Sequence, residues 1–256
     1  MESSDQIPPK TLIHRGRGAA AEAQRDADVL RFVGRFRFVT DELLAKRFGV
    51  SRQQMNLRLR RLTAAGLLQR TDSRTQPRLT MLTRKGARAV DLPIRRAPRT
   101  DAQREHELSL VWLVIELERA GGVRVFTERE CRTLEAAGAA QFSVPVLPPD
   151  RPRERRWPDL VLERDGRRWA VELELSAKGM TRLRAIVDAY ATSDYAEVMF
   201  LAGGETVARW LAAAIARASR RGPFARTGRV GAALRVAPSP TLGAAEHRSV
   251  VAVVAP

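Results

Sequence analysis

The 256-residue sequence has one cysteine, Cys131, and three histidines, His14, His106 and His247. A single cysteine forms no internal disulfide, and histidines this far apart do not show the spacing of a zinc site. No stretch approaches the roughly 18 apolar residues that a membrane-spanning helix needs. Residues 1–10 are polar and lack the apolar region of a secretory signal. These absences predict a cytoplasmic protein with no membrane partner.

Acidic residues are scarce in the first hundred positions. Residues 1–100 hold 22 Lys and Arg against 9 Asp and Glu, a net charge of +13, whereas the remainder holds 23 against 20. A GC-rich genome would favour Arg over Lys, and Arg outnumbers Lys 41 to 4 here, but such a bias would not concentrate the charge in one region. A basic region displaces counterions from nucleic acid, so the charge favours a nucleic-acid partner.

Two helices separated by a tight turn are predicted between Thr40 and Ala65, after an amphipathic helix that begins at Ala21. Thr40 is a favourable N-cap for the first, and Gly49 suits its C-terminal end. Ser51 then caps the second helix, Ser51 to Ala65, after about three residues. This is the spacing of a helix-turn-helix.

The second helix has an apolar face and a polar face. Met55, Leu59 and Leu62 recur at helical spacing and are expected to point inward, so the polar side chains on the opposite face are placed to hydrogen-bond base edges in a major groove. Leu68 and Leu79 to Leu82 predict two strands of a hairpin, whose arginines, Arg70 among them, are placed to reach phosphates. The predicted DNA-contacting residues are Ser51, Arg52, Gln53, Gln54, Asn56, Arg60, Arg61, Arg74 and Arg78.

Residues 21–92 resemble the winged helix-turn-helix family, because caps, turn, core positions and wing follow in the family's order. The resemblance implies that the Ser51 to Ala65 helix enters the major groove of double-stranded DNA. The alternative is a small helical domain whose basic face is only solvated or contacts another protein.

After a Pro- and Arg-rich stretch, the pattern changes to alternating helices and strands. Arg156 to Glu163 and Trp169 to Leu175 predict two strands joined by an Asp165-Gly166 turn, and the preceding Pro- and Arg-rich residues 144–156 predict a loop. A mixed sheet flanked by helices follows from this order. The other predicted elements are a helix at 101–120, a strand at 123–128, a helix containing 183–190, a strand at 197–201, a helix containing 207–215 and a last strand at 250–254.

Three acidic residues of this hairpin are candidates for chemistry. Glu172 and Glu174 are two apart on one strand, so they share a face, and Asp159 begins the partner strand. The alternation of Val171 and Leu173 with these acids predicts that the acids face away from the core. Clustered carboxylates are the hard oxygen ligands that suit Mg²⁺ or Mn²⁺. The alternative is an ordinary solvated strand face.

The order Pro158-Asp159, then Glu172-Leu173-Glu174, resembles the PD-(D/E)XK nuclease-like superfamily. The resemblance implies that Asp159 and Glu172 bind the metal and that the residue two further on activates water. That residue is usually Lys, whereas this sequence has Glu174, so Lys178 is a substitute candidate. An upstream acid is also implied, for which Glu128 is preferred over Glu105, Glu107 and Glu130.

The combined order is similar to the replication-relaxation family of plasmids and mobile elements, over roughly residues 25–220. The resemblance implies a DNA-binding protein of plasmid replication or mobilisation, with a second copy of the chain or other replication and mobilisation proteins as candidate partners. A Mg²⁺- or Mn²⁺-dependent endonuclease is the alternative function; otherwise no cofactor is expected. The expected fold is two-domain, α+β or α/β, with a restriction-endonuclease-like second domain. The expected segments are an arm at 1–20, the winged helix-turn-helix at 21–92, a basic linker at 93–100, the nuclease-like domain at 101–220 and a tail at 221–256.

Overall fold

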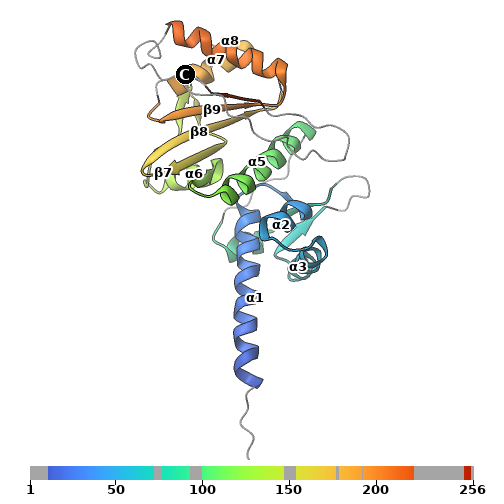
Figure 1. Ribbon diagram of the computed structural model, residues 1–256. Helices are drawn as coiled ribbons and strands as arrows, with labels where there is room; N and C mark the ends of the chain where they lie inside the picture. The colour runs from blue at the N-terminus through green and yellow to red at the C-terminus, as the bar shows by residue number, and fades with distance from the viewer. Residues whose placement is uncertain are drawn as a thin grey trace, which may run out of the picture. The chain divides into compact units, whose positions relative to one another are not determined.

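The protein, seen in a computed structural model, is divided into two compact units that both combine helices with strands (Figure 1). The first unit falls within residues 1–97, and the second is made chiefly by residues 98–256. None of the described helices is long and apolar enough to cross a membrane. The structure describes residues 11–71, 77–92, 100–146, 154–176, 179–191, 193–221 and 251–254.

The described residues of the first unit form four helices and a small antiparallel sheet of order β1-β3-β2. Its helices pack through the predicted apolar side chains, with Phe32 of the first helix and Leu59 of the third both buried. Its elements are α1 (Thr11–Gly34), β1 (Val39–Thr40), α2 (Asp41–Phe48), α3 (Arg52–Ala64), β2 (Leu68–Arg70), β3 (Leu79–Leu82) and α4 (Arg84–Ala89).

The ends of α2 and α3 follow the predicted caps. The Thr40 side chain accepts a hydrogen bond from the Leu43 amide, and Gly49 ends α2 in the left-handed conformation, with φ of 63°. Ser51 caps α3, so the turn between the two helices is three residues long. Helix α1 is longer than predicted, because residues 11–20, expected to be an arm, belong to it. The alanine-rich stretch at 19–23 explains this, since alanine is the strongest helix former.

Helix α4 begins against the turn that links α3 to β2. The Thr83 hydroxyl donates to the carbonyl oxygens of Gly66 and Leu67, at 2.6 and 3.1 Å, and accepts from the Gly86 amide. Gly86 is buried so close to this turn that a Cβ atom there would lie 2.0 Å from the Leu67 carbonyl oxygen. The short helix is therefore fixed to the base of the β2–β3 hairpin.

Among its described residues, the second unit has a five-stranded mixed sheet of order β10-β9-β8-β7-β4, in which β8 and β9 run parallel. The predicted mixture of helices and strands is confirmed, but α6, β5 and β6 were not predicted. Its elements are α5 (Asp101–Ala120), β4 (Arg124–Thr127), α6 (Glu128–Ala136), β5 (Val144–Val146), β6 (Glu154–Arg156), β7 (Leu160–Arg164), β8 (Arg167–Glu174), α7 (Met180–Ala191), β9 (Glu197–Ala202), α8 (Glu205–Arg221) and β10 (Val251–Val254).

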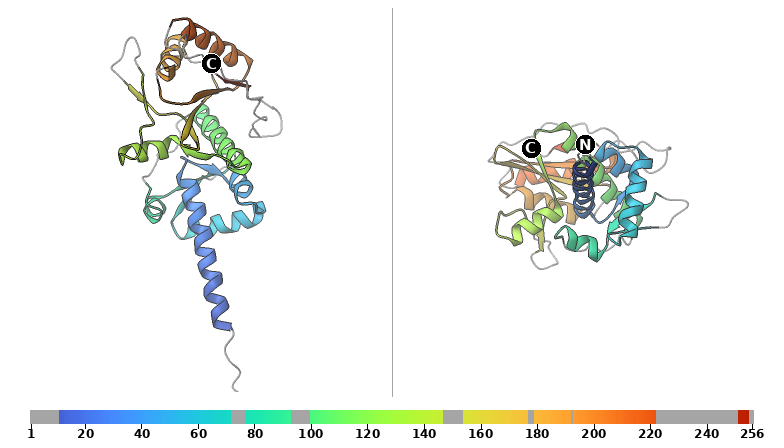
Figure 2. Two further views of the ribbon diagram at one scale, coloured as in Figure 1. Left: turned by 60° about the vertical axis from the view of Figure 1, so that its left-hand side comes forward. Right: turned by 90° about the horizontal axis from the view of Figure 1, so that it is seen from below.

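Helices cover both faces of this sheet (Figure 2). Helices α7 and α8 lie side by side on one face, and α8 contacts β9 and β10. Helix α5 contacts β8 and β4 on the other face. All five residues from Ala170 to Glu174 are consequently buried, whichever way their side chains point.

Two local features of the second unit bear on the sequence predictions. The β7–β8 turn has Asp165 and Gly166 at φ of 51° and 73°, which is the backbone that an Asp-Gly hairpin favours. Residues 144–156 were predicted to be a loop. This is wrong at both ends of the segment, where β5 and β6 pair as a separate antiparallel sheet. The alternating burial of Val144, Pro145 and Val146 indicates the physical reason, since one side of β5 reaches the core.

Candidate functional site

Helix α3 presents an exposed face that carries Gln53, Leu57 and Arg60. These residues are spaced by four and three positions, so their side chains are neighbours on one face of the helix. Leu57 is 71% exposed, the most exposed large apolar side chain among the described residues. Arg60 is exposed and has no acidic partner within the described ranges. The same holds for Arg52 at the start of the helix.

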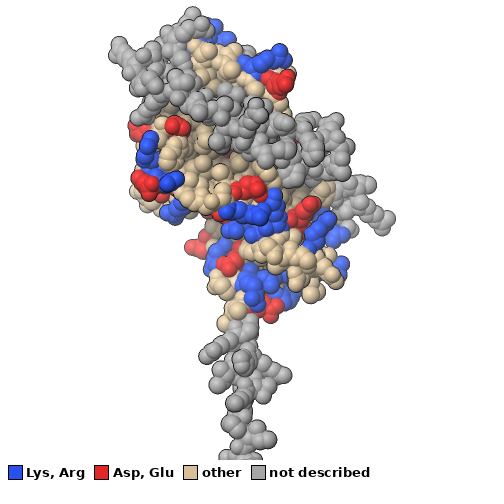
Figure 3. Space-filling model, in the orientation of Figure 1, with Lys and Arg blue, Asp and Glu red and all other residues tan. Residues whose placement is uncertain are grey.

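Arg61, predicted to contact DNA, is instead held by two acids of α1. Its guanidinium forms ion pairs with the carboxylates of Glu22 and Asp26, and its Nη2 atom lies 3.1 Å from Oδ1 of Asp26. Nε of Arg58 lies 3.5 Å from the same Oδ1 atom. The hydrogen bond from Arg61 is the main reason that the pKa of Glu22 is lowered. Figure 3 shows basic and acidic side chains together where α1 passes α3. Arg61 is thus a less available contact than Arg60.

Three other residues predicted to contact DNA differ from the open face of α3, because two of them cap the helix and one is half-buried. Ser51 and Gln54 form a capping box, in which each side chain accepts from the other residue's backbone amide, at 3.1 and 3.0 Å. Asn56 is half-buried, and its Oδ1 atom is buried without a hydrogen-bond partner among the described residues. Met55, Leu59 and Leu62 are buried as predicted, but the prediction that Asn56 lies on the exposed face is wrong: Leu57 lies there instead.

The arginines of the β2–β3 hairpin differ in their surroundings. Arg70, predicted to reach phosphates, is buried at its side chain and pairs with Asp41 at the start of α2. Asp41 also accepts a hydrogen bond from Thr80 of β3, at 3.2 Å. Arg70 therefore fixes the hairpin to α2. Arg78 is exposed, and Arg74 lies outside the described residues.

The three candidate acids of the second unit come together, but two of them are buried. Glu172 is 0% exposed and Glu174 is 2% exposed. The prediction that these acids face away from the core is therefore wrong. Strand β8 lies between β7 and β9 with helices on both sides, and Glu172 shares the face of Ala170, which packs in the core with residues of α7.

Arg156 and Tyr190 satisfy the buried carboxylate of Glu172. Arg156 donates from Nε to Oε1 at 3.2 Å and from Nη2 to Oε2, and the Tyr190 hydroxyl donates to Oε1. The same Nη2 atom lies 4.0 Å from Oε1 of Glu174. Burial and the nearby charge of Asp159 raise the pKa of Glu172 to about 7, against the opposing effect of Arg156.

Asp159 lies at the start of β7 with partners of its own. Its Oδ2 atom is 3.2 Å from Nε2 of His106 on α5 and accepts from the Leu173 amide at 2.8 Å. Burial alone would raise the pKa of Asp159, but the contact with His106 and the Leu173 amide lower it. The Glu128 amide donates to the Asp159 carbonyl oxygen at 3.0 Å, so the predicted upstream acid is indeed near. The Glu128 carboxylate, however, pairs with Arg132 at 2.7 Å.

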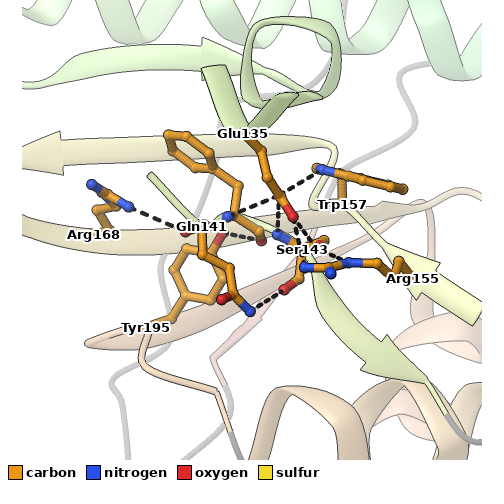
Figure 4. A network of polar contacts seen from close by, with 8 residues as sticks. Glu135, Gln141, Ser143, Arg155, Trp157, Arg168 and Tyr195 are labelled. Atoms are coloured by element: carbon orange, nitrogen blue, oxygen red, sulfur yellow. Dashed lines mark hydrogen bonds and ion pairs between the residues drawn. The ribbon is translucent and has the colours of Figure 1, made fainter. Parts of the chain in front are cut away.

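A second polar network, shown in Figure 4, holds the strand that carries Arg156. Glu135 accepts hydrogen bonds from Arg155, Ser143 and the indole of Trp157, at 2.7, 2.6 and 2.9 Å. Burial would raise the pKa of Glu135, but the hydrogen bonds from the Ser143 hydroxyl, two backbone amides and Trp157 lower it. Successive residues of a strand face opposite sides, so with Arg155 directed to Glu135, Arg156 is directed to Glu172.

His106, Arg156 and Tyr190 were not predicted as site residues. The sequence offers one signal for Arg156, which stands directly before the Trp157-Pro158-Asp159 strand start. Tyr190 and His106 lie 18 and 53 residues from the acids that they contact, and no local pattern joins positions so far apart.

A cavity of about 390 Å³ lies beside Asp159. Its wall includes Glu128, Arg156, Trp157, Asp159 and Arg182. Within the described ranges no three His, Cys, Asp or Glu side chains converge as metal ligands. Both oxygens of Glu172 are engaged, so these residues do not fit a Mg²⁺ or Mn²⁺ ion, which needs open oxygens at close to 2 Å. The remaining predicted residue, Lys178, lies outside the described residues.

No family model matches this sequence, and neither the curated proteins nor the solved structures include a match.

Proposed function

We propose that this protein binds double-stranded DNA through the first unit, with α3 in the major groove and the β2–β3 hairpin beside it. The observation that carries the proposal is the open face of α3. Gln53 can both accept from and donate to an adenine edge, Arg60 can donate two hydrogen bonds to a guanine edge, and Leu57 offers an apolar surface to a thymine methyl group. The three-residue turn and the caps of α2 and α3 support a helix-turn-helix. The setting is the replication or mobilisation of a plasmid or mobile element.

We further propose that the second unit has a nuclease-like core. The chain order α5-β4-α6-β5-β6-β7-β8-α7-β9, in which the antiparallel β7–β8 hairpin is followed by a helix and a parallel strand, supports this. The position of Asp159 opposite the strand of Glu172 supports it too. The carboxylates are engaged by Arg156, Tyr190 and His106, which favours a domain that helps to position DNA or partners rather than one that cuts DNA.

The first test is the substitution Arg60→Ala. We expect it to weaken binding to a duplex selected from a random library by about 1–3 kcal/mol, because one paired base contact is lost. Arg61→Ala is the matched control: it removes a neighbouring charge that already pairs with Glu22 and Asp26, so the loss should be smaller. Fluorescence anisotropy measures both. An unchanged site preference in Arg60→Ala would count against α3 as the reading helix.

A second test addresses Leu57. Replacing thymine by uracil removes only the methyl group, so at one position of the selected site we expect about a fourfold loss of affinity, the value of one buried methyl. The Leu57→Ala variant should bind the thymine and uracil duplexes equally. If wild type and Leu57→Ala show the same difference in affinity between the thymine and uracil duplexes at every position, Leu57 does not recognise thymine.

The nuclease alternative is tested with supercoiled plasmid and Mg²⁺ or Mn²⁺. We expect wild type and Asp159→Asn to leave the plasmid equally intact, because the carboxylates that would hold the metal are already paired. Nicking by wild type that disappears in Asp159→Asn would establish the endonuclease instead.

A further inference from the structure

The acid cluster of the second unit contains its own cation. Glu172 lies completely buried, and a buried carboxylate requires a positive partner. Arg156 supplies it from β6, 16 residues away, with a two-pronged contact to both Glu172 oxygens. One of those nitrogen atoms also faces Glu174, at 4.0 Å. The guanidinium thus serves two carboxylates at once.

Three observations indicate that the side chain of Arg156 has a fixed position. Tyr190 of α7 donates to the same Glu172 oxygen that accepts from Nε of Arg156. The preceding residue, Arg155, is held by Glu135 and Ser143 in the network of Figure 4. The side chain of Arg156 itself is only 21% exposed. A guanidinium held in this way keeps its planar, two-pronged geometry.

We infer that Arg156 is the resident counter-ion of Glu172 and Glu174, beside Asp159, and takes the place of a divalent metal at these acids. A metal ion that chelated Glu172 through both oxygens would have to displace the guanidinium, because Arg156 already donates hydrogen bonds to both of these oxygens. The native protein therefore keeps these acids together without metal, and removal of the guanidinium opens the cluster to one. This inference does not depend on DNA binding by the first unit.

Manganese alone is the probe, and it is measured in two ways on the full chain. The electron paramagnetic resonance signal of free Mn²⁺ falls as the ion binds, and the midpoint temperature of unfolding rises with binding. The five proteins to compare are wild type, Arg156→Ala, Arg155→Ala, Asp159→Asn and the double variant Arg156→Ala/Asp159→Asn. Arg155→Ala removes a neighbouring arginine whose carboxylate partner lies outside the cluster. Arg156→Gln, which keeps hydrogen-bond donors, replaces Arg156→Ala if that variant does not fold.

We expect that neither wild type nor Arg155→Ala binds Mn²⁺ at these acids, so Asp159→Asn should not change the binding signal. Arg156→Ala should bind Mn²⁺, with a rise in midpoint temperature of about 3–6 °C at ten times the Kd, and the double variant should lose this binding. Binding by wild type that Asp159→Asn abolishes would overturn the inference, because the metal would then coexist with Arg156. Folded Arg156 variants that bind no Mn²⁺ would overturn it as well, because the acids would then not form a cation position.

Discussion

Replacing Arg156 by Met is expected to lower the free energy of unfolding of the second unit by about 3–5 kcal/mol at pH 8, because Glu172 is left as a buried charge without its cation. At pH 5.5 the loss should be clearly smaller. The pKa of Glu172 is already raised to about 7, and removing Arg156, which lowers it, raises it further. In acid, the variant therefore buries a neutral carboxyl group.

The direction of the pH effect in the native protein follows from the same group. A carboxyl group with a raised pKa binds its proton more tightly in the folded than in the unfolded state, so its contribution to stability is lost as the pH rises from about 4.5 through about 7. Arg156 limits this loss. Stability should therefore depend on pH more steeply over this range in Arg156→Met than in wild type.

Tryptophan fluorescence measures this effect in the second unit alone, because all four tryptophans (Trp112, Trp157, Trp169 and Trp210) belong to it. Unfolding in urea at pH 5.5 and pH 8 gives the two free energies. Arg155→Met is the control: its side chain is 58% exposed, and Glu135 keeps four other donors, so we expect less than about 1 kcal/mol. Equal losses for both variants, or the same loss for Arg156→Met at both pH values, would contradict the role given to Arg156.

The second large effect is expected for Gly86→Ala in the first unit. Replacing Gly by Ala inside a helix normally stabilises it by up to about 1 kcal/mol. At this position the new Cβ would lie 2.0 Å from the Leu67 carbonyl oxygen and 2.9 Å from its carbon. Both atoms are backbone and cannot rotate away, so we expect a loss of about 3 kcal/mol, at the upper end for an overpacked site.

Circular dichroism in the far ultraviolet is the suitable measurement, since the first unit has no tryptophan. Its unfolding should begin at lower temperature in Gly86→Ala, while the fluorescence transition of the second unit stays where it was. Gly179→Ala is the control, because a Cβ atom there would meet nothing within 4 Å. An unshifted first transition in Gly86→Ala would mean that α4 moves away from the turn at no cost.

Local signals predicted much of the backbone, because caps and turns depend on residues close in sequence. Thr40, Gly49 and Ser51 set the ends of α2 and α3, and Asp165-Gly166 sets the β7–β8 hairpin. Each of these positions requires either a capping side chain or a residue that tolerates a positive φ, and these residue types can be read from the sequence.

The candidate sites were less predictable, because their key contacts join distant positions. Arg61 meets Glu22 from 39 residues away, and Tyr190 meets Glu172 from 18. Apolar residues alternate with acids along β8, which is typical of a strand with one solvated face. A strand with a parallel neighbour is, however, commonly covered on both faces, and the helix predicted between β8 and β9 was the signal that Glu172 is buried.

The contact of Arg70 with Asp41 has a consequence for recognition. It connects the β2–β3 hairpin to the first residue of α2, and Thr80 adds a second link to the same carboxylate. The base of the β2–β3 hairpin and the pair α2–α3 are thus already assembled in the free protein. A surface that is already organised loses little conformational entropy when it binds, so the affinity of this unit for DNA would be decided by the contacts it makes and not by the cost of ordering itself.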